Sequence, residues 1–130
     1  MTKLPEAEPT TRVLAMPADT NPAGDIFGGW IMSQVDIAGG IAAGRRAGMR
    51  VATVAVKSFA FKKPVYVGDL ISCYARVIEV GKTSITVDVE VYAERNRHPK
   101  DVVRVTEAVL TYVALDVNAQ PISVPPLTEI

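Results

Sequence analysis

The most apolar stretch of the chain runs from residue 26 to residue 43 and reads IFGGWIMSQVDIAGGIAA. It is long enough to raise the question of a membrane span. Gln34 and Asp36 lie near its middle, however, and an ionised carboxylate there would be costly in lipid. Because apolar and small side chains surround the whole helical circumference, we predict a buried helix from about 27 to 46 that is covered on most sides. Asp25 precedes this helix and is expected to accept hydrogen bonds from the free amides of its first turn.

Runs rich in β-branched residues follow the predicted helix and indicate strands. Residues 84–93 alternate polar and apolar side chains, which is typical of an antiparallel strand with one wet face. Short connections at Pro64 and at Val80-Gly81-Lys82 favour meander-like pairing. The sequence thus predicts an α+β fold in which one long helix lies in the concavity of a curved antiparallel sheet of about five strands. The expected strands cover about 11–16, 52–62, 69–80, 83–95 and 102–116.

The length of 130 residues suits one domain, which we place at residues 9–119. Residues 1–8 and 120–130 are rich in proline and polar residues, and we expect flexible termini there. Lys plus Arg and Asp plus Glu both number 14, so no overall charge attracts nucleic acid or an anionic membrane. We therefore expect neither a nucleic acid nor a membrane as a partner.

Cys73 is the only cysteine, which excludes an internal disulfide and leaves a zinc cluster without its usual ligands. A reducing compartment suits such a chain. The first residues lack the apolar core of a secretory signal, so we expect a cytoplasmic protein. We expect no metal site.

Two adjacent glycines, Gly28 and Gly29, fall in the first turn of the predicted helix, where backbone amides lack helical acceptors and the helix dipole favours negative charge. Without Cβ atoms they let a ligand approach closely. Such a turn can hold the oxyanion that develops during acyl transfer. The same pair could instead merely allow tight helix packing.

Asp36 follows Gly28 by eight residues, which corresponds to a helical rise of about 12 Å. A catalytic carboxylate and an oxyanion donor must each lie about 3 Å from the reacting atoms, so a working site would need these two residues from different subunits. Gly39 and Gly40 are expected to leave a groove on the carboxylate's face of the helix. The alternative is a buried carboxylate satisfied by neighbours such as Ser33 and Gln34.

The string GDIFGGWIMSQVD, preceded by DTN and followed by TVAVKSFAFKKPVYVGD, resembles the YciA-type acyl-CoA thioesterases among the hotdog-fold acyl-CoA hydrolases. The resemblance covers about residues 11–116. It implies a hotdog domain that hydrolyses acyl-CoA to free fatty acid and CoA, with active sites at a dimer interface and a hexamer built as a trimer of dimers. It also implies that CoA enters only as part of the substrate and that no cofactor is required.

The resemblance implies that Asp36 is the catalytic acid residue, that Asn21 is a second catalytic position, and that the Gly28 amide polarises the thioester carbonyl. Taken alone, Asn21 would form an Asx turn before Pro22. Two positions depart from the family pattern: the chain has Asn21-Pro22-Ala23-Gly24 for Asn-Ala-Asn-Gly, and Lys57 for an acid. The acyl-chain preference of the family is therefore not carried over.

We expect Asp36 either to activate water as a general base or to attack the thioester and form a mixed anhydride. Coenzyme A is polyanionic, so its pocket needs polar and cationic groups near the mouth. The candidates are Gly29, Ser58, Lys62, Lys63 and Lys82, and solvated strand ends are the alternative for each side chain.

Two other functions compete with hydrolysis. A hotdog hydratase would pair the helix acid with a histidine, but the only histidine, His98, lies far along the chain in a loop. A non-catalytic acyl-CoA sensor or oligomerisation module could use the same fold. Asp36 favours the enzyme, because a module that only binds does not need a carboxylate at this position.

Overall fold

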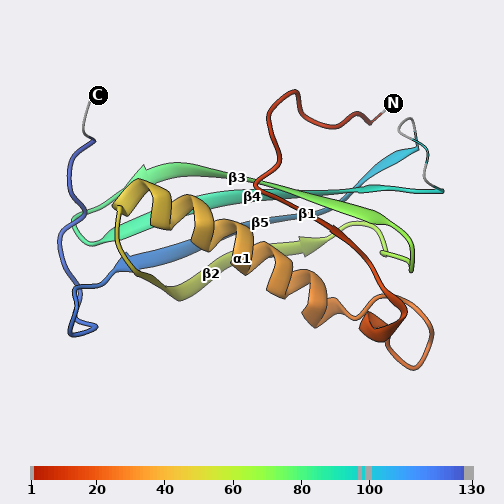
Figure 1. Ribbon diagram of the computed structural model, residues 1–130, viewed down its shortest axis with the longest axis horizontal. Helices are drawn as coiled ribbons and strands as arrows, with labels where there is room; N and C mark the ends of the chain where they lie inside the picture. Colours follow the sequence, from red (N-terminus) through yellow and green to blue (C-terminus); the bar gives the residue numbers. More distant parts are fainter. Residues whose placement is uncertain (1, 97, 99–100, 128–130) are drawn as a thin grey trace.

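The computed structural model describes residues 2–96, 98 and 101–127, which form one long helix and a five-stranded sheet (Figure 1). All strand pairs are antiparallel, in the order β1-β3-β4-β5-β2. The α+β prediction and all five predicted strands are therefore confirmed. The elements are β1 (Thr11–Leu14), the short 3-10 helix η1 (Pro17–Asp19), α1 (Gly28–Ala47), β2 (Val51–Phe61), β3 (Leu70–Val80), β4 (Ser84–Glu94) and β5 (Val102–Ala114).

The core lies between α1 and one face of the sheet (Figure 1). The helix contributes Ile31, Val35 and Ala38, while every second residue of β4 from Ile85 to Ala93 points inward and is fully buried. This burial follows the alternation of apolar residues in β4, since successive strand side chains point to opposite faces. Each apolar side chain that is fully removed from water contributes on the order of 2 kcal/mol.

The prediction that α1 is covered on most sides is wrong for a single chain. The sheet covers one side only, and Met32 and Ile37 on the helix are 44% and 52% exposed. A helix with apolar residues all round needs further cover, and one chain does not supply it. None of the described helices combines the length and apolar character needed to cross a membrane.

The helix begins without the side-chain cap that the sequence suggested. Phe27 is the N-cap residue, with an extended backbone (φ −63°, ψ 130°) and no side-chain cap hydrogen bond. Asp25 is instead held in the preceding turn, where its N–H donates to Asn21 Oδ1 (3.2 Å) and its carbonyl accepts from Asn21 N–H (2.8 Å). The prediction that Asp25 caps α1 is wrong, because this turn places Asp25 two residues before the cap position.

The helix ends at Gly48, whose left-handed backbone (φ 68°) lets its N–H donate to Gly44 O at 2.8 Å. Beyond β5 the chain returns across the end of the sheet, where Ile122 N–H donates to Ala114 O and Val124 N–H donates to Lys82 O. Residues 121–125 therefore lie against the domain. The predicted domain limits of 9–119 stay a prediction.

Candidate active site

Asp36 lies in the middle of α1 with its side chain exposed. Thr53 Oγ1 donates to Asp36 Oδ1 at 2.6 Å, and the Tyr112 hydroxyl lies 3.0 Å from the same oxygen and 3.0 Å from the Asp36 carbonyl. Asp36 Oδ2 accepts no hydrogen bond from the described residues. The alternative of a buried carboxylate satisfied by Ser33 and Gln34 is therefore not what the structure contains.

The two partners of this carboxylate, Thr53 and Tyr112, are not among the predicted site residues. Thr53 in β2 and Tyr112 in β5 are directly opposite one another in the β2–β5 ladder, and both reach toward α1. Tyr112 is only 1% exposed, and burial together with the Asp36 carboxylate raises the pKa of its phenol above the usual range. Tyr112 therefore remains a proton donor throughout the neutral range. Only the strand register identifies this pair, so no local pattern could have found it.

The predicted groove beside Asp36 is filled. A Cβ atom at Gly39 would overlap the Tyr112 hydroxyl and lie 3.0 Å from Tyr112 Cζ, whereas at Gly40 the nearest atom of the same ring is 3.8 Å away. The first contact is too short for any side chain, while the second is an ordinary one. Gly39 thus makes room for Tyr112, and the prediction of an open groove beside Asp36 is wrong at Gly39.

A pocket of about 310 Å³ opens beside Asp36 on the side away from these glycines. We call it the Asp36 pocket. Among the described residues that line this pocket, Ser33, Asp36 and Thr53 are the ones with polar side chains. The carboxylate therefore faces a mainly apolar space that is suited to a hydrocarbon chain. The pocket is lined by Gly29, Met32, Ser33, Asp36, Thr53, Val56, Phe59 and Leu110.

A separate pocket of about 320 Å³, the Gly28 pocket, lies at the start of α1. It brings together four of the predicted site residues, namely Asn21, Gly28, Lys62 and Lys63. The first backbone N–H groups of α1 with acceptors are those of Trp30 and Ile31, which donate to Phe27 O. The amides of Gly28 and Gly29 therefore have no acceptor among the described residues, as the first turn of a helix predicts.

The two glycines of this turn differ in the contacts that a side chain would make. A Cβ atom at Gly29 would lie 2.8 Å from Phe27 Cε1, so the Phe27 ring, which belongs to a residue that is 56% exposed, would have to shift. At Gly28 the nearest atom would be Phe61 Cζ at 3.7 Å, which is an ordinary contact. Packing does not require glycine at position 28.

Asn21 forms the Asx turn that was predicted for this residue taken alone. Its Oδ1 accepts hydrogen bonds from Ala23 N–H (3.0 Å) and Asp25 N–H (3.2 Å). Because Oδ1 is engaged, only the side-chain amide nitrogen is available to a ligand in the Gly28 pocket.

The remaining predicted residues lie elsewhere in one chain. Ser58, in the exposed part of β2, and Lys82, in the β3–β4 hairpin, line neither pocket. Lys82 belongs to the end of the sheet near the C-terminus of α1, where the neighbouring Thr83 O accepts from Ala114 N–H. Gly28 and Asp36 also line different pockets, so a single chain does not present both to one thioester.

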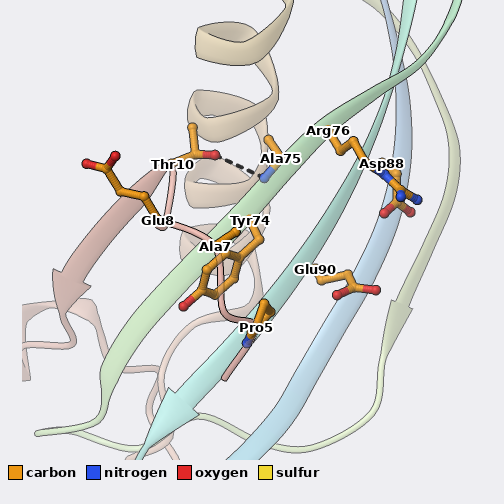
Figure 2. Close-up of a pocket in the computed structure, with 9 residues that line it drawn as sticks. All are labelled: Pro5, Ala7, Glu8, Thr10, Tyr74, Ala75, Arg76, Asp88 and Glu90. Carbon is orange, nitrogen blue, oxygen red and sulfur yellow. Dashed lines mark hydrogen bonds between the residues drawn. The ribbon is translucent and has the colours of Figure 1, made fainter. Parts of the chain in front are cut away.

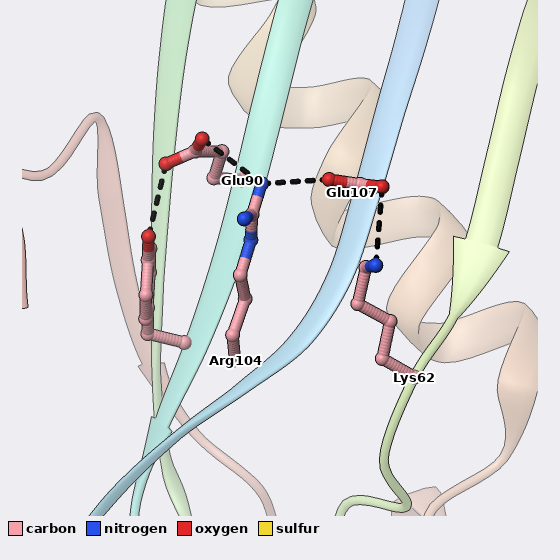
Figure 3. A network of polar contacts seen from close by, with 5 residues as sticks. Lys62, Glu90, Arg104 and Glu107 are labelled. Carbon is pink, nitrogen blue, oxygen red and sulfur yellow. Dashed lines mark hydrogen bonds and ion pairs between the residues drawn. The ribbon is translucent and has the colours of Figure 1, made fainter. Parts of the chain in front are cut away.

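The face of the sheet turned away from α1 carries a network of charges (Figure 3). Arg104 bridges Glu90 (3.0 Å) and Glu107 (2.7 Å), and Glu107 also pairs with Lys62 at 3.2 Å. Tyr92 donates its hydroxyl proton to Glu90 at 3.0 Å. One of the two lysines of the Gly28 pocket is therefore partly neutralised by a neighbouring acid.

On the same face, a depression of about 390 Å³ lies between the N-terminal segment and strands β3 and β4 (Figure 2). Arg76, Asp88 and Glu90 line it from the sheet, and Glu8 lines it from the N-terminal segment. Burial and the neighbouring Glu90 raise the pKa of Asp88. His98 lies in the β4–β5 connection and lines neither this depression nor the two pockets near α1.

Comparison with known proteins identifies relatives along most of the chain. Residues 23–100 match the family described as the Thioesterase superfamily. The chain is 46% identical over 127 residues to the acyl-CoA thioester hydrolase YciA of Salmonella typhimurium, covering 96% of each protein. It is 44% identical over 124 residues to YciA of Escherichia coli K12, covering 94% of each.

Solved structures have the same fold. A hexameric thioesterase from Yersinia pestis superimposes with a TM-score of 0.88 at 51% identity, over 95% of this chain and 99% of that one. An acyl-CoA hydrolase from Staphylococcus aureus, solved with butyryl coenzyme A and coenzyme A, superimposes with a TM-score of 0.81 at 32% identity, over 88% of this chain and 70% of that one.

Proposed function

Since this chain belongs to the thioesterase superfamily and has the hotdog fold, we propose that it hydrolyses acyl-CoA thioesters to free acid and CoA. Asp36 serves as the catalytic carboxylate. The Gly28 N–H of a second subunit binds the thioester oxygen. The observation that carries this proposal is the exposed Asp36 carboxylate, which is held through Oδ1 at the edge of a mainly apolar pocket.

A site shared between subunits is supported by the separation of its two parts. Gly28 and Asp36 are about 12 Å apart along α1, which is too far for both to contact one carbonyl group. The Gly28 amide has no acceptor within the part of its chain that the structure describes, and the lysines of its pocket can meet the phosphates of CoA. Ser58 and Lys82 belong to the CoA site only if a second subunit brings them to it.

The surfaces that one chain leaves uncovered support a dimer. Strand β2 is an edge strand, and Val54 is 57% exposed on it. Met32 and Ile37 on α1 are exposed as well. An apolar edge strand and an uncovered helix face both favour association with a second copy. Several relatives of known structure are hexameric, and we propose that this chain forms a trimer of such dimers.

In the proposed reaction, the ionised Asp36 removes a proton from water, whose oxygen attacks the thioester carbon. The negative charge that develops on the carbonyl oxygen is stabilised by Gly28 N–H. The tetrahedral intermediate then collapses, the C–S bond breaks, and the CoA thiolate leaves and takes up a proton. Asn21, which lines the Gly28 pocket, orients the water through its side-chain amide.

The second mechanism begins with attack of Asp36 on the thioester carbon, which expels CoA thiolate and forms a mixed anhydride that water hydrolyses. A single turnover in ¹⁸O-labelled water detects the anhydride when water opens it at the Asp36 carbonyl. Direct attack by water on the thioester and opening of the anhydride at its acyl carbon both place the label in the released acid. Label in the Asp36 carboxylate after one turnover supports the anhydride.

Substitution of Asp36 tests the catalytic assignment. We expect Asp36→Asn to lower kcat on short acyl-CoA substrates by at least about a hundredfold while CoA still binds, because the amide cannot act as a base. Release of CoA is followed with a thiol reagent, and binding of CoA is followed by calorimetry. Tight binding of acyl-CoA by the wild-type protein without turnover at any chain length would instead favour the non-catalytic sensor.

Mixing two inactive variants tests the shared site. Gly28→Pro removes the proposed donor at the first helical position, where proline is tolerated, and the extended backbone of Phe27 suits a residue before proline. Gly28→Ala retains the N–H and is the matched control. In a mixture of Gly28→Pro and Asp36→Asn subunits, each mixed dimer has one intact site, so we expect about a quarter of wild-type activity. A site within one chain would give no recovery.

A further inference from the structure

We propose that Tyr112 is a positioning residue for Asp36: its hydroxyl holds one carboxylate oxygen and the main-chain carbonyl of Asp36, so that the other carboxylate oxygen stays directed at the substrate. Gly39 provides the space that this hydroxyl needs. The inference rests on the proposed function, since it concerns how the same carboxylate is oriented.

The Tyr112 hydroxyl contacts both the side chain and the main chain of Asp36. The Tyr112 hydroxyl lies 3.0 Å from Asp36 Oδ1 and 3.0 Å from Asp36 O, and Thr53 Oγ1 reaches the same Oδ1 at 2.6 Å. An exposed aspartate on a helix surface would otherwise exchange between rotamers. The single hydroxyl proton of Tyr112 is shared between Asp36 Oδ1 and Asp36 O. Together with the Thr53 hydroxyl it selects one orientation of the carboxylate, and Oδ2 is left for the water or the thioester.

The position of Tyr112 makes it a rigid support. It lies in β5, between β4 and β2, and its side chain is 1% exposed within the core. A buried aromatic ring has little freedom to move, so its hydroxyl is a fixed point against which a mobile exposed carboxylate is oriented.

Gly39 supplies an independent observation. Glycine weakens the interior of a helix, so its presence one turn beyond Asp36 needs a reason. A Cβ atom at Gly39 would overlap the Tyr112 hydroxyl, whereas the contact at Gly40 is an ordinary 3.8 Å. The helix thus lacks a side chain at the position where one would displace the hydroxyl from Asp36.

The competing explanation is purely structural. A buried phenol needs a hydrogen-bond acceptor, and the Asp36 carbonyl alone would satisfy it. In that case the carboxylate is only a neighbour, and loss of the hydroxyl would change stability but not the chemistry.

Tyr112→Phe removes the hydroxyl and keeps the ring. For this variant we expect kcat to fall about tenfold, as for loss of a hydrogen bond to a charged group, with KM changed less than about twofold. Unchanged kcat would overturn the proposal.

Gly39→Ala and Gly40→Ala form a matched pair that leaves Tyr112 in place. We expect Gly39→Ala to lower kcat as Tyr112→Phe does, while Gly40→Ala leaves kcat within about twofold of wild type. Added to Tyr112→Phe, Gly39→Ala should lower kcat little further, since the hydroxyl is already absent. Equal effects of the two alanines on kcat would contradict the role assigned to Gly39.

A measurement without turnover separates this inference from the proposed function. Thermal unfolding of Asp36→Ala, Tyr112→Phe and the double variant reports the coupling between the two side chains. A clear departure from additivity supports the contact with the carboxylate, even if wild-type protein hydrolyses no acyl-CoA. Additive losses would show that the hydroxyl serves only the main-chain carbonyl, and the proposal would fail.

Discussion

Cys73 and Asp36 are both able to act as nucleophiles in principle, and they differ in their access to solvent. Cys73 in β3 is 1% exposed, and burial raises the pKa of its thiol to about 11, although the neighbouring Thr11 side chain opposes the shift. Asp36 is exposed beside an apolar pocket. At the scale of single residues, burial therefore removes the thiol from the chemistry and leaves the carboxylate.

The reactivity of Cys73 follows from this burial. With a pKa of about 11, only about one thiol in a thousand is ionised at pH 8. We expect native protein to react with a thiol reagent at least about a hundredfold more slowly than protein unfolded in guanidinium. Fast labelling of the native protein would contradict the buried position. A CoA-release assay with a thiol reagent also requires that Cys73 of the native protein does not react, because only the thiol of CoA should be detected.

The end of β2 and the middle of β5 carry the charges that influence the Gly28 pocket. Lys62, just after β2, pairs with Glu107 of β5, and both side chains are more than two-fifths exposed. Ion pairs this exposed contribute at most about 1 kcal/mol to folding. Their larger effect is on the field that an anionic ligand meets at the pocket.

Removal of the acid tests this effect. We expect Glu107→Gln to change the free energy of unfolding by less than about 1 kcal/mol and to lower KM for acyl-CoA about twofold to threefold, because Lys62 is no longer neutralised. The change in KM should disappear at high salt. Glu6→Gln alters the net charge equally at an exposed N-terminal position, and a similar fall in its KM would show that only overall charge matters.

At the scale of the whole molecule, the sheet of a single chain covers only one side of α1. Apolar side chains remain exposed on the edge strand β2 and on the face of α1 away from the sheet, among them Val54 and Ile37. The same regions contain parts of both pockets. Under the proposed shared site, assembly is linked to activity, since association in that dimer buries apolar surface and brings a Gly28 pocket to an Asp36 pocket.

A charge placed on the β2 edge tests this link. We expect Val54→Asp to lower the native mass by light scattering to that of a monomer and to abolish turnover, because a buried unpaired carboxylate opposes association. Ile78→Asp introduces the same charge at an exposed position of β3 and should leave at least a dimer with activity. A monomeric Val54→Asp variant that remains active would eliminate the shared site.

Local order in the sequence was enough to predict the elements. The alternation in β4, the glycine at the end of α1 and the short connections each depend on neighbours within a few residues, so the helix and all five strands were predicted to within about two residues at each end. Gly28 was correctly placed in the first helical turn, with its amide lacking an acceptor among the described residues. These features follow from backbone geometry alone.

Contacts between distant parts of the chain were decided only by the tertiary structure. Asp36 is 17 residues from Thr53 and 76 residues from Tyr112, and the β2–β5 register brings both donors to one carboxylate oxygen. The same register fills the space at Gly39 that the helix pattern alone left open, and the turn around Asn21 takes Asp25 away from the helix start. Periodicity specifies which face a residue occupies, but the side chain it meets there depends on how the strands pair.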